Sequence, residues 1–285
     1  MRFFKVILLV LFLSNWTVLT AQSEEKKKPD YGWEQQSTFT LNFTQTTFDN
    51  WVQGGENSWA WIAEAPFMFN LRKPGFTWAN QGKLAFGKSK VGDQSARKAS
   101  DLIRFESVYT HNLGVFVNPY VSISGQTQFA KGYNYGDTTR AEISGFMDPG
   151  YFTQSAGVGY EPNRFVKLRL GAAVKETFAR NHPVPYTDDP ETEELETSKV
   201  EFGADFVADG RINLHDNLIF TSKVVLFSTL ESLNTVDVDW DNNFTATVTS
   251  HLQVNFNVQI YYDRDISKKR QLKQLLSVGF SYTLI

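Results

Sequence analysis

The sequence contains no cysteine in 285 residues, so no disulfide framework can hold the chain together. Beyond the first 21 residues it also lacks any apolar run near the roughly 20 residues that a membrane-spanning helix needs. The 28 basic and 31 acidic residues nearly balance, and a net charge of −3 gives no reason to expect a nucleic-acid partner. These absences exclude a disulfide-stapled secreted domain and a helical membrane protein.

Aromatic residues, by contrast, are abundant: 24 Phe, 11 Tyr and 7 Trp make up 15% of the chain. The mean hydropathy is −0.32, which in isolation indicates a soluble protein. A membrane β-barrel escapes this test, because only alternate residues of each strand need to be apolar. The composition therefore leaves open both a soluble all-β protein and a barrel.

The first 21 residues have the features of a cleaved secretory signal peptide. Two basic residues precede an unbroken apolar run at residues 6–13, and Leu19 and Ala21 occupy the −3 and −1 positions of a cleavage site. We expect cleavage after Ala21, with Ser23 as the alternative; an anchoring helix is disfavoured because the apolar run is too short. Residues 22–32 are charged, and we expect a disordered periplasmic lead-in rather than a binding segment.

Residues 271–285 have a period of two, which predicts a strand with one apolar and one polar face. The large apolar residues at alternate positions are Leu272, Leu276, Val278, Phe280, Tyr282 and Leu284. Lys273, Ser277 and Gly279 are among the small or polar residues between them. A final strand of about ten residues at the carboxyl terminus is typical of the strand that closes an outer-membrane barrel.

Eleven similar segments precede this one, so the sequence predicts an all-β, antiparallel transmembrane barrel of about twelve strands in one domain, residues 33–285. The connections after the second, sixth, eighth and tenth segments are short, whereas those after the third, fifth, seventh, ninth and eleventh are longer and more polar. Short periplasmic turns and long external loops produce this alternation. A secreted β-sandwich, the alternative, gives no reason for loop lengths to sort in this way. The expected segments are 33–48, 58–71, 76–88, 101–110, 120–130, 151–160, 165–178, 199–213, 218–227, 236–249, 252–262 and 271–285.

In such a barrel the polar face of each strand points into the lumen, so the candidate lumen charges can be read from the pattern. The basic candidates are Lys83, Arg104, Lys167, Arg169, Lys175 and Lys223. The acidic candidates are Glu64, Glu106, Glu201, Asp205, Asp237, Asp239 and Asp241. We expect Lys167 and Arg169 to meet Glu201 and Asp205 on the next strand, because cross-strand ion pairs brace and narrow a small barrel. A pore for anionic solutes, the alternative, should have a mainly basic lumen.

Asp237, Asp239 and Asp241 also resemble the start of a calcium-binding loop. The EF-hand pattern requires Gly at its sixth position and Glu at its twelfth, where this chain has Asn242 and Val248. We therefore expect lumen or rim charges rather than a metal site, and the sequence implies no cofactor.

Nothing in the sequence predicts an enzyme. The four histidines fall in expected loops or turns, and none has a serine two residues further on, as the catalytic strand of outer-membrane phospholipases does. An outer-membrane hydrolase stays open as a minor alternative, since loops can assemble sites that spacing does not reveal.

The segment Asn50-Trp51-Val52-Gln53-Gly54-Gly55-Glu56-Asn57 follows an aromatic strand and resembles the N-terminal signature of an uncharacterised outer-membrane family, the domain of unknown function numbered 3078. The strand pattern downstream is similar over nearly the whole mature chain. The resemblance implies a barrel in the Gram-negative outer membrane and supplies no substrate. We expect the two glycines to adopt positive φ, the flanking asparagines to hydrogen-bond the local backbone, and Trp51 to lie at the interface or over the barrel mouth. We expect a hairpin that fixes register rather than a ligand site.

Two functions remain open from the sequence. The first is a narrow channel or transport barrel. The second is a non-conducting interaction or scaffold barrel of the envelope, whose loops around Gly54, Asp137 and Asp188 bind a partner. Outer-membrane lipid and, during insertion, the barrel-assembly machinery are the other partners that a barrel implies.

Overall fold

The computed structural model describes residues 31–50, 52–135, 140–189, 192–230 and 235–285. These residues form strands, turns and loops, and no helix in this part of the chain has the length and apolarity needed to cross a membrane. The strands are β1 (Gly32–Thr46), β2 (Ser58–Lys73), β3 (Phe76–Val91), β4 (Arg97–His111), β5 (Val117–Thr127), β6 (Gly132–Tyr135), β7 (Arg140–Ser144), β8 (Gly150–Asn163), β9 (Val166–Phe178), β10 (Ser198–His215), β11 (Leu218–Thr229), β12 (Asp237–Thr249), β13 (Leu252–Tyr262) and β14 (Gln271–Thr283). The predicted signal peptide and almost all of the lead-in lie outside the described residues.

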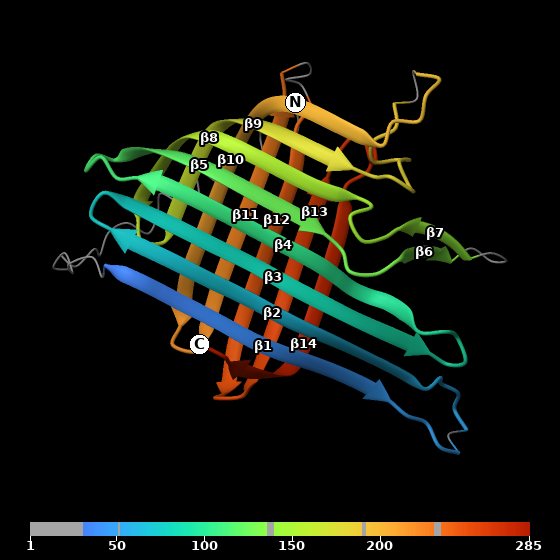
Figure 1. Cartoon of the computed structure of the whole chain (residues 1–285). Helices are drawn as coiled ribbons and strands as arrows, with labels where there is room; N and C mark the ends of the chain where they lie inside the picture. Colours follow the sequence, from blue (N-terminus) through green and yellow to red (C-terminus); the bar gives the residue numbers. More distant parts are fainter. Residues whose placement is uncertain (1–30, 51, 136–139, 190–191, 231–234) are drawn as a thin grey trace. The chain divides into compact units, whose positions relative to one another are not determined.

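Twelve of these strands form a closed antiparallel barrel, in the order β1-β14-β13-β12-β11-β10-β9-β8-β5-β4-β3-β2 (Figure 1). Each strand pairs with its neighbours in sequence, apart from the β6–β7 hairpin, which forms a separate two-stranded sheet between β5 and β8. The last strand, β14, returns to β1 and closes the barrel. The prediction of a twelve-stranded barrel closed by the C-terminal strand is confirmed.

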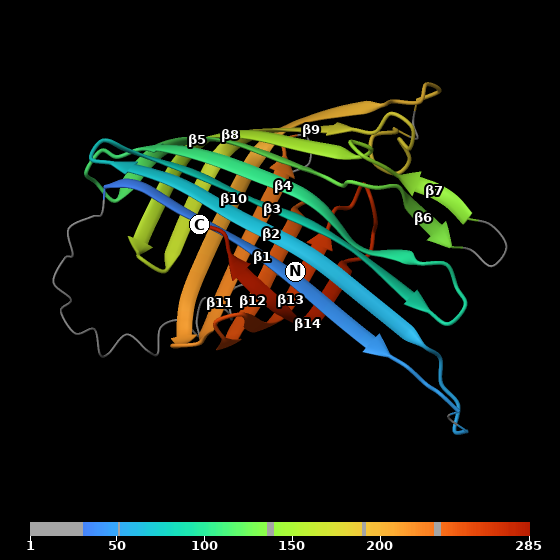
Figure 2. The same cartoon turned by 60° about the horizontal axis from the view of Figure 1, so that its bottom comes forward.

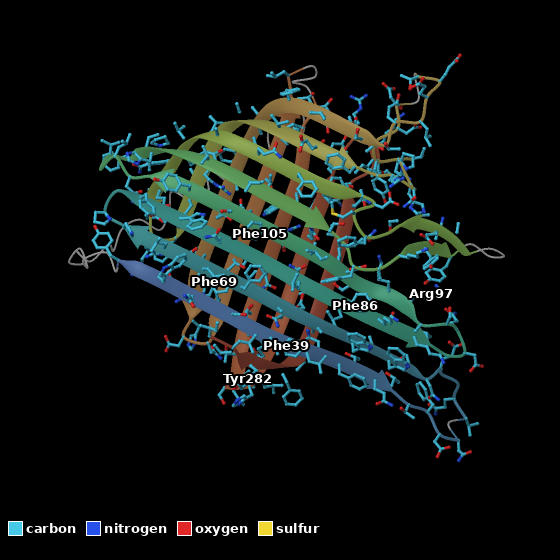
Figure 3. The ribbon with its side chains drawn as sticks, viewed as in Figure 1. Phe39, Phe69, Phe86, Arg97, Phe105 and Tyr282 are labelled. Atoms are coloured by element: carbon cyan, nitrogen blue, oxygen red, sulfur yellow. The ribbon has the colours of Figure 1, made fainter. Side chains whose placement is uncertain are left out.

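The alternation of side chains along each strand places apolar residues outside and polar residues inside. On β1, Phe39 and Leu41 are 41% and 43% exposed on the outer face, whereas Thr40 and Asn42 are 3% and 5% exposed on the inner face. The same outward position is held by Phe69, Phe86 and Phe105 on the next strands and by Tyr282 on β14 (Figure 3). This polarity is the reverse of that of a soluble protein, and it is what a bilayer around the barrel requires.

A few polar groups on the outer face satisfy one another. The indole Nε1 of Trp78 donates to Ser107 Oγ at 2.9 Å, and that hydroxyl donates to Asn80 Oδ1 at 2.8 Å. A second set on β11 and β12 repeats this arrangement, with Trp240, Ser222 and Asn242 at 3.0 and 2.8 Å. In each Trp-x-Asn segment the indole N–H and the asparagine side chain therefore hydrogen-bond to one serine hydroxyl. Polar groups that face the lipid, which offers no hydrogen bonds, are satisfied within the protein.

The connections sort by length between the two ends of the barrel. The short turns after β2, β8, β10 and β12 lie at the end where β1 begins and β14 finishes, and the longer connections lie at the other end. One predicted loop was wrong, because β3 continues to Val91 and β4 starts at Arg97, which leaves only residues 92–96 between them. The polar residues at the end of β3 and the start of β4 extend the sheet, because the hydrogen bonds between strands join backbone groups and do not require apolar side chains. Similarly, the predicted loop 131–150 contains the β6–β7 hairpin, and His111 and His215 end strands β4 and β10 rather than lying in turns.

The connection after β1 has the backbone that its sequence predicts. Asn50, Gly54 and Gly55 have φ of 53°, 83° and 143°, and the backbone N–H of Phe48 donates to Asn57 Oδ1 at 2.6 Å. A side chain at position 55 would lie 2.6 Å from the Phe48 ring, so only glycine fits there. Trp51 lies outside the described residues.

Candidate functional site: a charged network in the lumen

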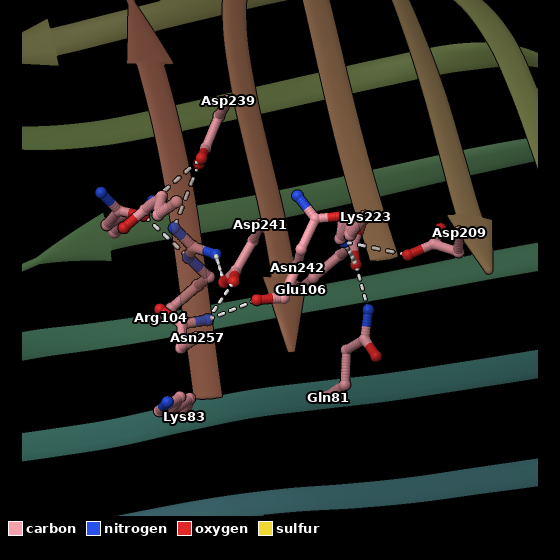
Figure 4. Close-up of polar contacts among 12 residues, drawn as sticks. Gln81, Lys83, Arg104, Glu106, Asp209, Lys223, Asp239, Asp241, Asn242 and Asn257 are labelled. Atoms are coloured by element: carbon pink, nitrogen blue, oxygen red, sulfur yellow. Dashed lines mark hydrogen bonds and ion pairs between the residues drawn. The ribbon is translucent and has the colours of Figure 1, made fainter. Parts of the chain in front are cut away.

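Glu106 on β4 is the centre of a charged network inside the barrel. Its carboxylate accepts hydrogen bonds from Lys223 Nζ on β11 and Gln81 Nε2 on β3, each at 2.5 Å (Figure 4). It accepts a third from Arg169 Nη2 on β9, also at 2.5 Å. Arg169 and Lys223 also lie 3.8 Å from the carboxylate of Asp209 on β10. Because β4 and β11 are five places apart in a ring of twelve strands, the Glu106–Lys223 contact crosses the lumen.

Arg104, two residues earlier on β4, reaches the opposite wall. Its guanidinium lies 3.1 Å from Asp239 and 3.7 Å from Asp241, both on β12, and it also donates to Gln126 Oε1 at 2.8 Å. β12 is six places from β4 in either direction around the ring, so these ion pairs join diametrically opposed strands. The lumen is therefore bridged by side chains at the level of Arg104 and Glu106.

Neutral amides complete the coordination of the β12 acids. Gln259 Nε2 donates to Asp239 at 2.9 Å, and Asn257 Nδ2 donates to Asp241 at 2.5 Å, both from β13. Amide donors of this kind reduce the cost of holding carboxylates away from bulk water. On the other side of the network, Lys83 of β3 pairs with Glu64 of β2 at 2.6 Å.

A second cluster surrounds Lys175 of β9, nearer the long loops. Its ammonium lies 2.7 Å from Asp237, 3.2 Å from Asp263 and 3.6 Å from Glu201. Lys199 pairs with Glu201 at 3.2 Å and also with a loop carboxylate beyond β13. Three carboxylates around one buried ammonium form a second tier of contacts between β9, β10, β12 and the β13–β14 loop.

Asp205, another candidate lumen residue, forms no ion pair with any residue that the structure describes and is held by hydrogen bonds from β5 and β8. Ser155 Oγ donates to its Oδ1 at 2.7 Å, and Tyr120 Oη lies 2.8 Å from Ser155 Oγ and 3.4 Å from Asp205 Oδ1. Tyr120 on β5 can reach Asp205 on β10 because Gly157 and Gly171 lie between them; a side chain at 171 would lie 2.5 Å from the Tyr120 hydroxyl.

The expected pairing of Lys167 and Arg169 with Glu201 and Asp205 is wrong. The register places Glu201 opposite Lys175 and Asp205 opposite Gly171. Lys167, half-exposed at the short-turn end, instead lies 3.5 Å from Glu161. Arg169, as described above, turns to Glu106 and Asp209.

The candidates from the sequence omit several residues of these clusters, among them Asp209, Asp263, Gln81 and Tyr120. Asp209 continues the polar face of Glu201 and Asp205 and could have been found by extending that strand. Asp263 lies in a loop, whose geometry a strand pattern does not predict. Gln81 and Tyr120 are uncharged and carry no signal in a list of charges.

Asp237, Asp239 and Asp241 do not converge on one point. The Asp237 carboxylate pairs with Lys175. Asp239 contacts Arg104 and Gln259. Asp241 contacts Arg104 and Asn257. In the described part of the chain no three His, Cys, Asp or Glu side chains are grouped so as to hold a metal ion.

The histidines have local roles. Ser250 Oγ lies 2.9 Å from His251 Nδ1 in an exposed turn, and His215 Nδ1 lies 2.9 Å from Asn217. No acidic side chain within the described residues orients the His251 ring, so the Ser250–His251 contact lacks the third member of a catalytic triad.

At the long-loop end, Asp148 joins two connections. It accepts hydrogen bonds from the backbone N–H groups of Asn181 and His182, each at 3.2 Å, and its Oδ2 lies 2.8 Å from His182 Nδ1. Burial alone would raise the pKa of Asp148, but the hydrogen bonds from His182 and Asn181 outweigh it and hold the pKa below its usual value. The β7–β8 connection is thereby fixed to the loop that follows β9.

A closed antiparallel barrel with an apolar outer face and a charged lumen is a bacterial outer-membrane β-barrel. Residues 131–284, more than half of the chain, match the family described as protein of unknown function, DUF481, and the chain belongs to that family. Residues 43–133 match the family described as protein of unknown function DUF3078, which confirms the resemblance in the segment around Asn50. That match ends at residue 133 and does not extend over nearly the whole mature chain as the strand pattern suggested.

No curated protein matches the chain. Among solved structures, it is similar to the translocator domain of autotransporter NalP from Neisseria meningitidis, with 10% identity, 90% of each chain covered and a TM-score of 0.40. It is also similar to the COG4313 outer membrane channel from Pseudomonas putida F1, with 8% identity, 93% of this chain and 100% of that chain covered, and a TM-score of 0.41. Likenesses at this level say nothing about function.

Proposed function

We propose that this protein is a non-conducting barrel of the Gram-negative outer membrane that presents an ordered interaction surface at its long-loop end. The observation that carries the proposal is the set of ion pairs from β4 to β9, β11 and β12, which bridge the lumen. The proposal includes export by a cleaved signal peptide at residues 1–21 and insertion with the help of the barrel-assembly machinery. It assigns no reaction to the chain.

The energetic argument rests on the burial of the network. Glu106 and Arg169 have side chains that are each 11% exposed. Leaving one charge of a buried ion pair without its partner costs about 3–5 kcal/mol, compared with about 0–1 kcal/mol for a pair on the surface. A solute that entered the lumen would have to separate several such contacts, so passive flow is disfavoured.

The interaction surface is supported by the order of the loops around Asp148. The loop after β9 is held at its start by Asp148 and further along by Thr187, whose hydroxyl donates to the Glu196 carbonyl at 2.6 Å. It carries a strongly acidic segment, and we propose that it binds a partner with a cationic surface. Asp137, in another loop that the sequence indicated, lies outside the described residues.

A narrow channel is the second candidate, and one observation favours it. Asp209 and Asp241 are about one-third exposed inside the barrel, so water can approach the network. On this alternative the lumen conducts whenever the bridging contacts open.

Planar-bilayer conductance of the refolded full-length protein tests the proposal. We expect a folded, heat-modifiable barrel that shows no steady current in symmetric salt. Steady open-channel current from the unmodified protein would contradict the non-conducting proposal and favour the channel. A porin of known conductance, incorporated in the same way, controls for successful insertion.

A further inference from the structure

The contact between β1 and β14, called the seam below, is much shorter than either strand. Five residue pairs join the two strands, from Thr38 opposite Thr283 to Asn42 opposite Gly279. Beyond them β1 still pairs with β2, and β14 still pairs with β13 as far as Gln271. Figure 2 shows the two strands diverging from this crossing toward the long-loop end. Residues 271–278 of β14 therefore have no strand on their second side within the described chain, and they are called the free edge.

The free edge lies in the apolar layer of the barrel. Three of its four outward side chains, Leu272, Leu276 and Val278, are apolar and exposed, and the fourth is Gln274. They continue the outer face that Phe280 and Tyr282 form on the same strand. Backbone N–H and C=O groups at this depth require hydrogen-bond partners, and acyl chains offer none. A lipid can therefore cover the side chains of the free edge but cannot satisfy its backbone.

Two buried polar atoms lie where the seam ends. Asn42 Oδ1 and Ser277 Oγ are buried and have no hydrogen-bond partner among the described residues. Asn42 belongs to the last pair of the seam, and Ser277 is two residues further along β14. Both atoms are enclosed by the chain itself, and they mark the point at which the pairing of β1 with β14 stops.

A cation lies further along the same edge. Lys273 faces the lumen beside Gln259 of β13 and makes no hydrogen bond or ion pair with a described residue. Its electrostatic neighbours include Lys83 and Arg104 as well as Glu64 and Asp241, and both of those acids already have cationic partners of their own. An added strand with a carboxylate at this position would supply the missing counter-charge.

We propose that the free edge of β14 binds an extended polypeptide segment from another protein by backbone pairing. Apolar side chains of that segment would lie toward the bilayer beside Leu272 and Leu276, and an acidic side chain would point inward beside Lys273. Addition of a strand to an exposed sheet edge is an established way for a peptide to bind, in which the backbone supplies affinity and alternate side chains supply specificity. The inference is independent of whether the lumen conducts.

The first experiment tests whether the edge is free, and the absence of native cysteine makes it direct. The variant Leu41→Cys/Phe280→Cys places two thiols on residues paired in the seam, and Phe43→Cys/Val278→Cys places them where the same register would continue. In bilayer nanodiscs we expect the first variant to form a disulfide, which also shows that it has folded, and the second to stay reduced. Equally fast disulfide formation in both would mean that the seam is fully paired, and would overturn the proposal.

The second experiment tests the occupant with a defined probe. The probe is a fluorescent nine-residue peptide with the sequence of residues 38–46 carrying Asn42→Asp, and its control is the same peptide with methylated backbone nitrogens. On the free edge its residues 38–44 would pair with 277–271, six residues away from the register of β1, which puts the new aspartate opposite Lys273. We expect the methylated peptide to bind nanodisc-embedded protein at least about tenfold more weakly, since it cannot complete the ladder. Equal binding of both peptides, or of neither, would overturn backbone pairing.

The charge of Lys273 supplies the specificity control. Lys273→Glu should reverse the preference, so that a peptide with Asn42→Lys binds more tightly than the one with Asn42→Asp. An unchanged preference would contradict the role given to Lys273. Disulfide-linked dimers of Leu276→Cys would assign the edge to a second copy of this chain and overturn the proposed occupant.

Discussion

Gly171 is the residue on which the Tyr120 contact depends. The tyrosine extends from β5 over β8 and β9 to Asp205 on β10, and a side chain at position 171 would meet its hydroxyl at 2.5 Å, Ser155 Oγ at 2.6 Å and the Ala156 carbonyl at 2.8 Å. The carbonyl belongs to the backbone ladder and cannot move aside. The close approach of three strands in this part of the wall therefore requires glycine.

We predict that Gly171→Ala destabilises the barrel by about 1–3 kcal/mol, the usual cost of overpacking a fitted interior. Urea unfolding in detergent, followed by the shift between folded and unfolded bands on a gel, measures the effect. Gly159→Ala is the matched control, because its added carbon would have its nearest neighbour at 3.6 Å. Equal midpoints for the two variants would show that the Tyr120 contact is not fitted around Gly171.

Asp148 supports a prediction about pH at the same scale. The pKa of Asp148 is lower in the folded protein than the usual carboxyl pKa. Its ionised carboxylate therefore stabilises the fold above the usual carboxyl pKa, and this stabilisation is lost as the pH falls through the pKa of the folded protein. The intrinsic rate of amide exchange itself falls in acid, so the quantity to compare is the protection factor. Below about pH 4 we expect smaller protection factors for the Asn181 and His182 amides than at pH 7. Asp148→Asn should show these smaller protection factors already at pH 7, with little further change in acid. Glu193→Gln, an exposed change in the same loop, should leave both amides protected.

At the scale of the strand, β9 carries three cations on one inner face with different surroundings. Lys175 is buried among three carboxylates, whereas Lys167 pairs with Glu161 where both side chains are largely exposed. The amino-acid sequence presents the two lysines as equivalent, and only the positions of the partner strands distinguish them.

We predict that Lys175→Met costs about 3–5 kcal/mol, since it leaves Asp237 and Asp263 without their counter-charge, beside a Glu201 that keeps only Lys199. Lys167→Met should cost about 0–1 kcal/mol, as expected for an exposed pair. Unfolding midpoints in urea at pH 7 compare the two variants on the same strand. A small loss for Lys175→Met would indicate that the loop after β13 relaxes away from the cluster.

The strand β9 also shows how much of the lumen could be predicted from the sequence. A period of two decides which residues share a face, so Lys175, Glu201 and Asp237 were correctly placed inside. It does not decide register: Asp205, which was expected to meet Lys167 or Arg169, lies opposite Gly171. The loop residue Asp263 lies beyond any such pattern.

At the scale of the whole molecule, closure of the barrel creates contacts that no pair of neighbouring strands reveals. Arg104 and Asp239 are 135 residues apart in sequence and meet only because β4 and β12 are on opposite walls. The same closure produces the short seam, whose length depends on the tilt and stagger of all twelve strands. The number of strands was predictable from alternation and turns, whereas the contacts across the lumen required the closed ring.

These contacts give a charge-specific prediction for the lumen. Arg104→Ala would remove the bridge to β12 and leave Asp239 and Asp241 without their cation, so we expect channel openings that prefer cations. The reciprocal variant, Asp239→Ala/Asp241→Ala, removes the same bridge but leaves Arg104 unpaired, and its openings should prefer anions. Reversal potentials in asymmetric KCl distinguish the two signs, and Lys167→Ala, outside the network, should stay silent like the unmodified protein. If both bridge variants conduct with the same ion selectivity, the current does not pass beside Arg104 and Asp239. If both variants are silent, the contacts of Glu106 close the lumen without the Arg104 bridge.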